Sequence, residues 1–177
     1  MKKWQMITSV VVALVAVLSL TVSAFAQTPQ PLSNETSAAL VMAINDEYKA
    51  RATYQAVLNK FGPVTPFSNI VRSESAHIAA LERLFNTYGL PIPPDTYMGN
   101  VLAPATVSEA ARIGVEAEKE NVAMYDTILA SVQEPDVIAV FIQLRDASHT
   151  KHLPAFQRVL SRNTDTGAQN LGPRWRR

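Results

Sequence analysis

The stretch SESAHIAAL, residues 73–81, places a glutamate and a histidine three residues apart among alanines and aliphatic residues. In an α-helix, residues three apart lie on the same face, so Glu74 and His77 project together. Neither side chain suits an apolar surface, and an ionised carboxylate is costly to bury without a partner. The pair therefore either faces water or points into a core and holds a bound group there, and the rest of the chain bears on this choice.

Apolar residues recur at spacings of three and four in four segments, which predicts four amphipathic helices. The segments cover residues 34–61, 66–88, 107–132 and 137–161. Proline and glycine separate them, and the connection over residues 89–104 is longer than an ordinary turn between helices. No segment alternates as a half-buried strand does. The expected fold is therefore all-α: a four-helix bundle of two helical hairpins joined by one long crossover.

Two of the predicted helices begin with capping signals. Thr106 and Glu109 have the spacing of a capping box, which places the start of the third helix. Before the fourth helix, Glu134, Pro135 and Asp136 interrupt the pattern, and Asp136 is the expected N-cap residue.

A glutamate and a tyrosine recur seven residues apart on the inner faces of the first and third helices. Glu47 precedes Tyr54, and Glu118 precedes Tyr125. Both glutamates lie mid-stripe, as does the pair in SESAHIAAL, and several buried carboxylates at one level would repel one another. A divalent cation resolves this, and bundles bind two iron or manganese ions through such glutamates and Glu-x-x-His pairs. The predicted ligands on the first three helices are Glu47, Glu74, His77 and Glu118.

The alternative is that these side chains face water. Lys49 and Arg51 lie near Glu47 and could pair with it at the surface. Glu116 and Glu120 flank the third-helix glutamate, so a small rotation of that helix would exchange ligand for surface residue. The repeated glutamate–tyrosine spacing, each copy preceding a helix with histidine, favours the metal site.

The fourth helix repeats the second in two registers that differ by one residue. HIAALERLF, from His77, matches HLPAFQRVL, from His152, which aligns Glu74 with His149. Upstream, the apolar residues align Glu74 with Ser148 instead. A π-bulge accommodates one extra residue inside a helix, and such bulges are frequent at functional sites. In either register, no carboxylate occupies the position that corresponds to Glu74.

Three residues of the fourth helix are candidate ligands. His152 ranks first because of the HLPAF match, His149 second, and Asp146, which forms an Asp-x-x-His pair with His149, third. Pro154 follows closely and is expected to kink the helix just past the site, because proline removes a backbone hydrogen bond.

The chain begins with the features of a secretory signal peptide. Lys2 and Lys3 precede an apolar run, and Ala24–Phe25–Ala26 fits a cleavage site. The expected division is a signal peptide at 1–26, a linker at 27–32, the bundle at 33–161 and a disordered basic tail at 162–177. The protein is therefore expected to be secreted or periplasmic, with an uncleaved membrane anchor as the alternative.

The composition of the 177-residue chain excludes several classes of site. It has no cysteine, so it has neither disulfides nor thiolate ligands. Removing the two lysines of the signal peptide from 16 basic residues leaves 14 against 15 acidic ones, a net charge of −1. This balance gives no reason to expect nucleic acid as a partner. No glycine-rich phosphate loop or nucleophile–base arrangement is present in the sequence.

Taken together, four motifs resemble a ferritin-like domain family of unknown function, a bacterial and archaeal group in the ferritin and rubrerythrin superfamily. They are DEYKARATY, PFSNIVRSESAHIAAL, the E-x6-Y around Glu118, and ASHTKHLPAF, and the resemblance covers about residues 32–160. It implies an up-down bundle with a dimetal carboxylate centre. It also implies that Glu47, Glu74, His77, Glu118 and His152 match the family's ligands, whereas a fourth-helix glutamate is missing.

Three functions are consistent with these residues. The first is an exported protein with two iron ions that oxidises ferrous iron or reacts with oxygen or peroxide; any enzyme activity would be that of a ferroxidase-like oxidoreductase. In this hypothesis, Glu74 and Glu118 bridge the metals. The missing carboxylate instead favours one zinc, copper or iron ion held without turnover. The third function is a metal-free interaction bundle. Manganese is a further candidate metal, and a homodimer is left open.

Overall fold

A computed structural model describes residues 30–169 of the chain, with side chains described as far as Arg162. This part of the chain is helical and contains no β-strand, which confirms the all-α prediction. Its elements are α1 (Asn34–Phe61), α2 (Phe67–Thr87), α3 (Val107–Leu129), α4 (Pro135–Ala147), the π-helical segment η1 (Ser148–His152) and α5 (Leu153–Gln169). The expected signal peptide lies outside the described residues. None of the described helices is both long and apolar enough to cross a membrane.

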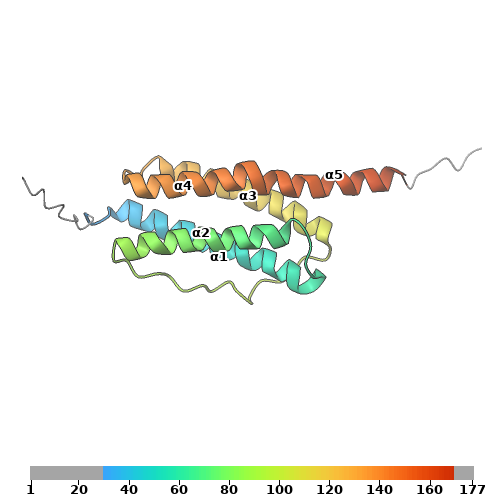
Figure 1. Ribbon diagram of the computed structural model, residues 1–177, viewed down its shortest axis with the longest axis horizontal. Helices are drawn as coiled ribbons and strands as arrows, with labels where there is room; N and C mark the ends of the chain where they lie inside the picture. Colours follow the sequence, from blue (N-terminus) through green and yellow to red (C-terminus); the bar gives the residue numbers. More distant parts are fainter. Residues whose placement is uncertain (1–29, 170–177) are drawn as a thin grey trace, which may run out of the picture.

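The bundle consists of two helical hairpins. α1 packs against α2, and α3 packs against a continuous rod formed by α4, η1 and α5 (Figure 1). The connection between α2 and α3 runs back along the bundle, so both helices begin at the same end (Figure 1). Arg51 fastens it to α1 by donating to Asp95 at 2.8 Å, and Lys60 donates to the carbonyl of Pro104 at 2.7 Å. The single long crossover agrees with the prediction from the sequence.

Local signals determine where most helices begin and end. Ser33 accepts a hydrogen bond from the Thr36 N–H at 3.0 Å and caps the start of α1, and Gly62, with a φ of 78°, follows its last residue as the C-cap. Thr106 caps α3 by accepting from the Glu109 N–H at 3.0 Å, as predicted. The fourth rod differs from the prediction, because Glu134 rather than Asp136 is its N-cap residue. The physical reason is that Pro135 suits the first helical position, where its fixed φ matches the helix and no N–H is needed.

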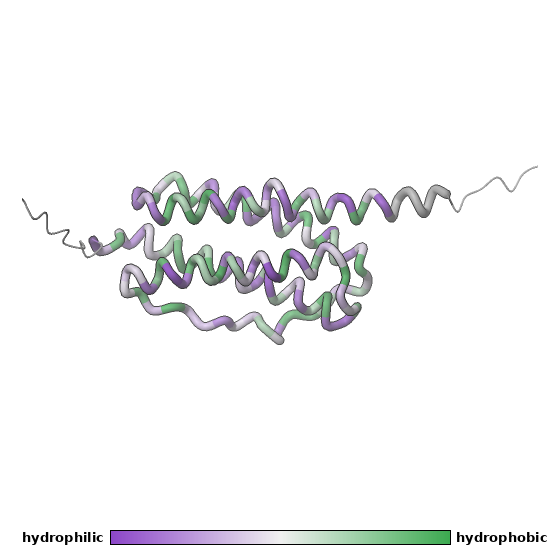
Figure 2. Tube along the Cα trace, in the orientation of Figure 1, coloured by the Kyte–Doolittle hydropathy of each residue, from purple (hydrophilic) through white to green (hydrophobic). Residues whose placement is uncertain are grey.

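Two apolar clusters occupy the two ends of the bundle, and a polar layer separates them. One contains Leu40, Ile44, Leu81, Phe85, Tyr125, Phe141 and Leu144, and the other contains Tyr54, Val57, Phe67, Ile70, Ala111, Val115 and Phe156. Along each rod, hydrophobic and hydrophilic residues alternate with the helical period (Figure 2). On the inner stripe of α1, Glu47 lies between Ile44 of the first cluster and Tyr54 of the second.

The π-helical segment lies where the two sequence registers disagree. The Leu153 N–H donates to the carbonyl of Ser148, five residues back, which is the wide turn that one extra residue requires. The π-bulge indicated by the sequence is therefore confirmed. Pro154 follows this turn directly, inside the helical rod. α5 continues past the expected end at residue 161 to Gln169, so the first part of the tail predicted to be disordered is helical, and the rest of that tail lies outside the described residues.

Close contact between α3 and α5 yields a first prediction. A Cβ atom added at Gly114 would lie 2.7–2.9 Å from three ring atoms of Phe156, which is fully buried. Gly114→Ala gains ~1 kcal/mol of helix propensity, but overpacking a rigid core costs ~1–3 kcal/mol. We expect a net loss of ~1 kcal/mol in urea unfolding. Combining it with Phe156→Leu should cost less than the sum of the two single changes; a stabilised Gly114→Ala variant would contradict this packing.

Candidate metal centre

Five ionisable side chains meet in the polar layer. α1, α2, α3 and the continuous rod of α4, η1 and α5 each contribute at least one of them, and none of the five is more than 5% exposed. They are Glu47 from α1, Glu74 and His77 from α2, Glu118 from α3 and His152 from η1. Burial of so many ionisable groups is costly unless they neutralise one another or a bound ion.

The first group consists of Glu47, Glu74 and His77. The Nδ1 atom of His77 lies 2.8 Å from Oε2 of Glu74 and 3.1 Å from Oε2 of Glu47. One potential ligand atom from each of the three residues lies within 4.8 Å of the others, so the group could hold a metal ion.

The second group consists of Glu74, Glu118 and His152 and has the same form. The Nδ1 atom of His152 lies 3.1 Å from Oε1 of Glu74 and 3.4 Å from Oε2 of Glu118. Here too, the potential ligand atoms lie within 4.8 Å of one another. Glu74 belongs to both groups, with one oxygen facing each histidine. Glu118 belongs to the second group alone, and the bridging role expected for it stays a prediction.

The two tyrosines of the repeated motif are exchanged between α1 and α3. Tyr54 of α1 donates to Oε1 of Glu118 at 2.8 Å, and Tyr125 of α3 donates to Oε1 of Glu47, also at 2.8 Å. Burial and the adjacent carboxylate charge raise the pKa of both phenols well above its ordinary value, so both remain donors. Each outer carboxylate is thereby oriented by the opposite hairpin.

The electrostatics of the centre depend on which groups carry protons. Burial and the nearby charge of Glu74 raise the pKa of Glu47 to about 7. Burial opposes charge on both histidines, but their carboxylate contacts prevail and raise the pKa of His77 to about 9 and that of His152 to about 10. Burial likewise opposes charge on Glu74, yet contacts with the two histidines lower its pKa. Without a metal, imidazolium cations therefore balance the carboxylates at neutral pH.

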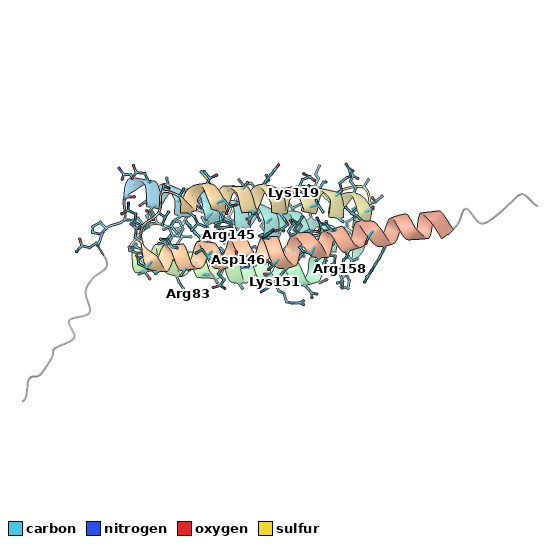
Figure 3. The ribbon with its side chains drawn as sticks, turned by 90° about the horizontal axis from the view of Figure 1, so that it is seen from above. Arg83, Lys119, Arg145, Asp146, Lys151 and Arg158 are labelled. Carbon is cyan, nitrogen blue, oxygen red and sulfur yellow. The ribbon has the colours of Figure 1, made fainter. Side chains whose placement is uncertain are left out.

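The structure brings together five of the six residues predicted as ligands. His149, the sixth, is exposed and outside both groups. The π-helical turn explains this, because it places His152 in the layer and leaves the residue three positions earlier on the outer surface. Asp146, the other alternative, also faces outward, where it pairs with Arg145 at 2.9 Å (Figure 3).

Two side chains that the sequence reading missed contact the groups. Ser73 lies between the two histidines, and Asn121 donates to Asp46 at 2.8 Å and to Glu47 at 3.5 Å. Asn121 could have been found, because it lies between Glu118 and Tyr125 on the inner stripe of α3. The contact between Ser73 and His152 could not have been found from the sequence, because the two residues are 79 positions apart in the chain.

A cavity of about 190 Å³ lies between α1 and α3 and reaches the carboxylates of Glu74 and Glu118. Tyr54 and Asn121 form part of its wall. Glu116, which is exposed, also lines it, so the cavity opens at the surface of α3. A water molecule takes ~30 Å³ of liquid, so the cavity holds a few waters or a small molecule of similar size. The candidate centre can therefore be reached by small solutes from its carboxylate side.

Comparison with known proteins establishes the family of the chain. Residues 36–171 match the model described as "Uncharacterized protein domain (DUF2202)". The chain belongs to the DUF2202 family. This domain is similar to the uncharacterized protein MJ0754 of Methanocaldococcus jannaschii, at 25% identity over 147 residues, covering 75% of this chain and 78% of that protein.

Solved structures support the fold of the DUF2202 domain. The crystal structure of MJ0754 aligns with a TM-score of 0.69 at 24% identity, covering 77% of this chain and 85% of that one. The hypothetical protein Pfu-1136390-001 from Pyrococcus furiosus aligns with a TM-score of 0.59 at 20% identity, covering 74% and 91%. The names of these relatives state no activity, and a shared fold does not determine function.

Proposed function

We propose that this DUF2202 protein is an exported, ferritin-like bundle whose polar layer holds a dimetal carboxylate centre with redox activity toward oxygen or peroxide. The observation that carries the proposal is the shared position of Glu74. Its two carboxylate oxygens face two different histidines, and each histidine has a second carboxylate of its own. Export is proposed from the signal-peptide features of residues 1–26.

The residues of the layer suit bound cations. Nδ1 of His152 is buried without a hydrogen-bond partner, although carboxylate oxygens lie 3.1 Å and 3.4 Å away. An imidazole nitrogen and two carboxylates are a donor set that iron, manganese and zinc accept. One ion would be held by Glu47, Glu74 and His77, and the other by Glu74, Glu118 and His152. When bound, iron would supply electrons for the reduction of oxygen or peroxide.

The protein itself contributes orientation, charge and a restricted route of access. Tyr54 and Tyr125 hold one oxygen of each outer carboxylate and leave the other oxygen for the centre. The apolar clusters on both sides of the layer exclude bulk water and so strengthen the electrostatic interactions within it. The cavity between α1 and α3 admits small molecules to Glu74 and Glu118, which suits oxygen or peroxide as substrate.

Metal loading tests the proposal. Purified mature protein should bind two equivalents of ferrous ion without oxygen, measured by anaerobic titration and elemental analysis, and should then consume oxygen when air is admitted. Asp126→Ala is a matched control, because Asp126 is exposed on α3, pairs with Arg145 on the outer surface and does not line the cavity. Failure to bind any divalent metal would refute the proposal.

One observation favours a second candidate function. Ser148, 2% exposed, occupies the position on the fourth rod where one sequence register would place a glutamate. With three carboxylates rather than four, the layer could hold one zinc, copper or iron ion without turnover. A titration that saturates at one equivalent, with no oxygen consumption, would support this function over the first.

A further inference from the structure

A single hydroxyl group joins the two histidines of the candidate centre. Oγ of Ser73 lies 3.2 Å from Nε2 of His77 and 3.0 Å from Nε2 of His152. The two rings are stacked, with centroids 5.6 Å apart and planes inclined by 24°. Both rings therefore direct Nε2 toward Ser73 and Nδ1 toward the carboxylates.

The hydrogen-bonding capacity of serine matches this arrangement. A hydroxyl oxygen has two acceptor lone pairs and can accept an N–H from each ring. A neutral imidazole carries one proton, and the partner of one ring nitrogen determines which nitrogen keeps it. Hydrogen bonds from both Nε2–H groups to Ser73 would leave a lone pair on each Nδ1, on the side where the carboxylates lie.

We propose that Ser73 is a positioning residue shared by both metal positions, which holds both imidazoles in the Nε2–H tautomer so that Nδ1 of each can bind a cation. This inference rests on the proposed function. Ser73 would thereby affect the binding of both ions, although it is not itself a ligand of either. Residues that orient metal-ligating histidines typically contribute 10–100-fold to metal affinity, so removal of this hydroxyl should weaken both positions by ~10-fold or more.

The chain offers a matched set of variants. Ser73→Ala removes the shared acceptor, and Ser73→Thr retains a hydroxyl. Ser75→Ala is the control, because Ser75 is exposed on the same helix and its hydroxyl donates to the carbonyl of Val71 at 2.9 Å. Binding is measured with Zn²⁺ by calorimetry and with Co²⁺ by absorption. Nitrogen NMR of the Zn²⁺-loaded protein reports the tautomer of each histidine, which a purely structural effect would leave unchanged.

The expected result is two Nε2–H tautomers in the unaltered protein, ~10-fold weaker binding at both positions in Ser73→Ala, and recovery in Ser73→Thr. Normal affinity in Ser73→Ala, weakening at one position only, or an Nδ1–H tautomer in the loaded protein would overturn the role of Ser73 while leaving the dimetal centre standing. An unaltered protein that binds neither Zn²⁺ nor Co²⁺ would overturn the proposed function, and this role with it.

Discussion

Glu74→Ala is expected to weaken both metal positions at once, by more than ~100-fold each. Glu74 is the residue common to the two groups, and each of its oxygens faces a different histidine. Loss of a residue that only orients a metal ligand costs about 10–100-fold in metal affinity, so loss of a ligand shared by both ions should cost more. Anaerobic titration with Fe²⁺ or Mn²⁺ measures the effect, and oxygen consumption after loading should fall with it.

Two controls separate loss of a ligand from loss of the fold. Glu74→Gln keeps the volume of the side chain and removes its charge, so it should also bind poorly while its helical circular dichroism stays unchanged. Asp126→Ala changes an exposed carboxylate of α3 that pairs with Arg145 outside the cavity, and it should bind metal as the unaltered protein does. If Glu74→Ala lost only one of two bound ions, the shared position of Glu74 would not be that of a bridge.

The metal-free and metal-loaded proteins are expected to differ increasingly in stability as pH rises from 6 to 9. In the metal-free protein, the pKa of His77 is raised to about 9 and that of His152 to about 10. Their stabilising contribution is complete below the unfolded value of about 6.5 and declines as pH rises through the folded values. The raised pKa of Glu47, about 7, acts in the same direction between about pH 4.5 and 7. The metal-free melting temperature should therefore fall toward pH 9.

Metal ions compete with protons for the two histidines, so metal binding strengthens as pH rises. A cation displaces the protons that the histidines carry, so its affinity should rise by up to about tenfold per pH unit for each proton released. A ligand that binds only the native state stabilises it by an amount that grows with the logarithm of its affinity. The gap between the melting temperatures of the loaded and the metal-free protein should therefore widen as pH rises. Thermal melts with Zn²⁺ or with a chelator at pH 6, 7, 8 and 9 measure this gap. A gap of zero at every pH would indicate a buried ion-pair network that binds no metal.

The exchange of the two tyrosines explains why the glutamate–tyrosine motif occurs twice. Within one helix, seven residues span nearly two turns, or ~10 Å of rise, so glutamate and tyrosine of the same copy are separated along the axis. Because α1 and α3 lie side by side, Tyr54 instead meets Glu118, and Tyr125 meets Glu47. The repeat therefore orients two carboxylates on facing helices, each against the apolar cluster that contains its tyrosine.

Much of the fold could be predicted, because the spacing of apolar residues and the capping residues within each segment determine where its helix lies. Helical periodicity identified α1 to the residue, Asn34–Phe61, and Thr106 marked the cap of α3. The match of HIAALERLF with HLPAFQRVL and the match of the apolar residues upstream differ in register by one residue, and this difference indicated the π-bulge. The N-cap of the fourth rod was predicted wrongly, because Pro135 and Asp136 both suit a helix start and the fixed φ of proline decided between them.

By itself, the sequence determined which helices exist, which stripe of each faces inward, and that glutamate and histidine lie midway along those stripes; all of these follow from spacing within single helices. Only the tertiary structure decided that Glu74 is shared, that His152 rather than His149 joins it, and that Ser73 contacts both histidines. These facts depend on distances between helices. Such distances are set by packing between segments far apart in the chain, and no periodicity within one segment encodes them.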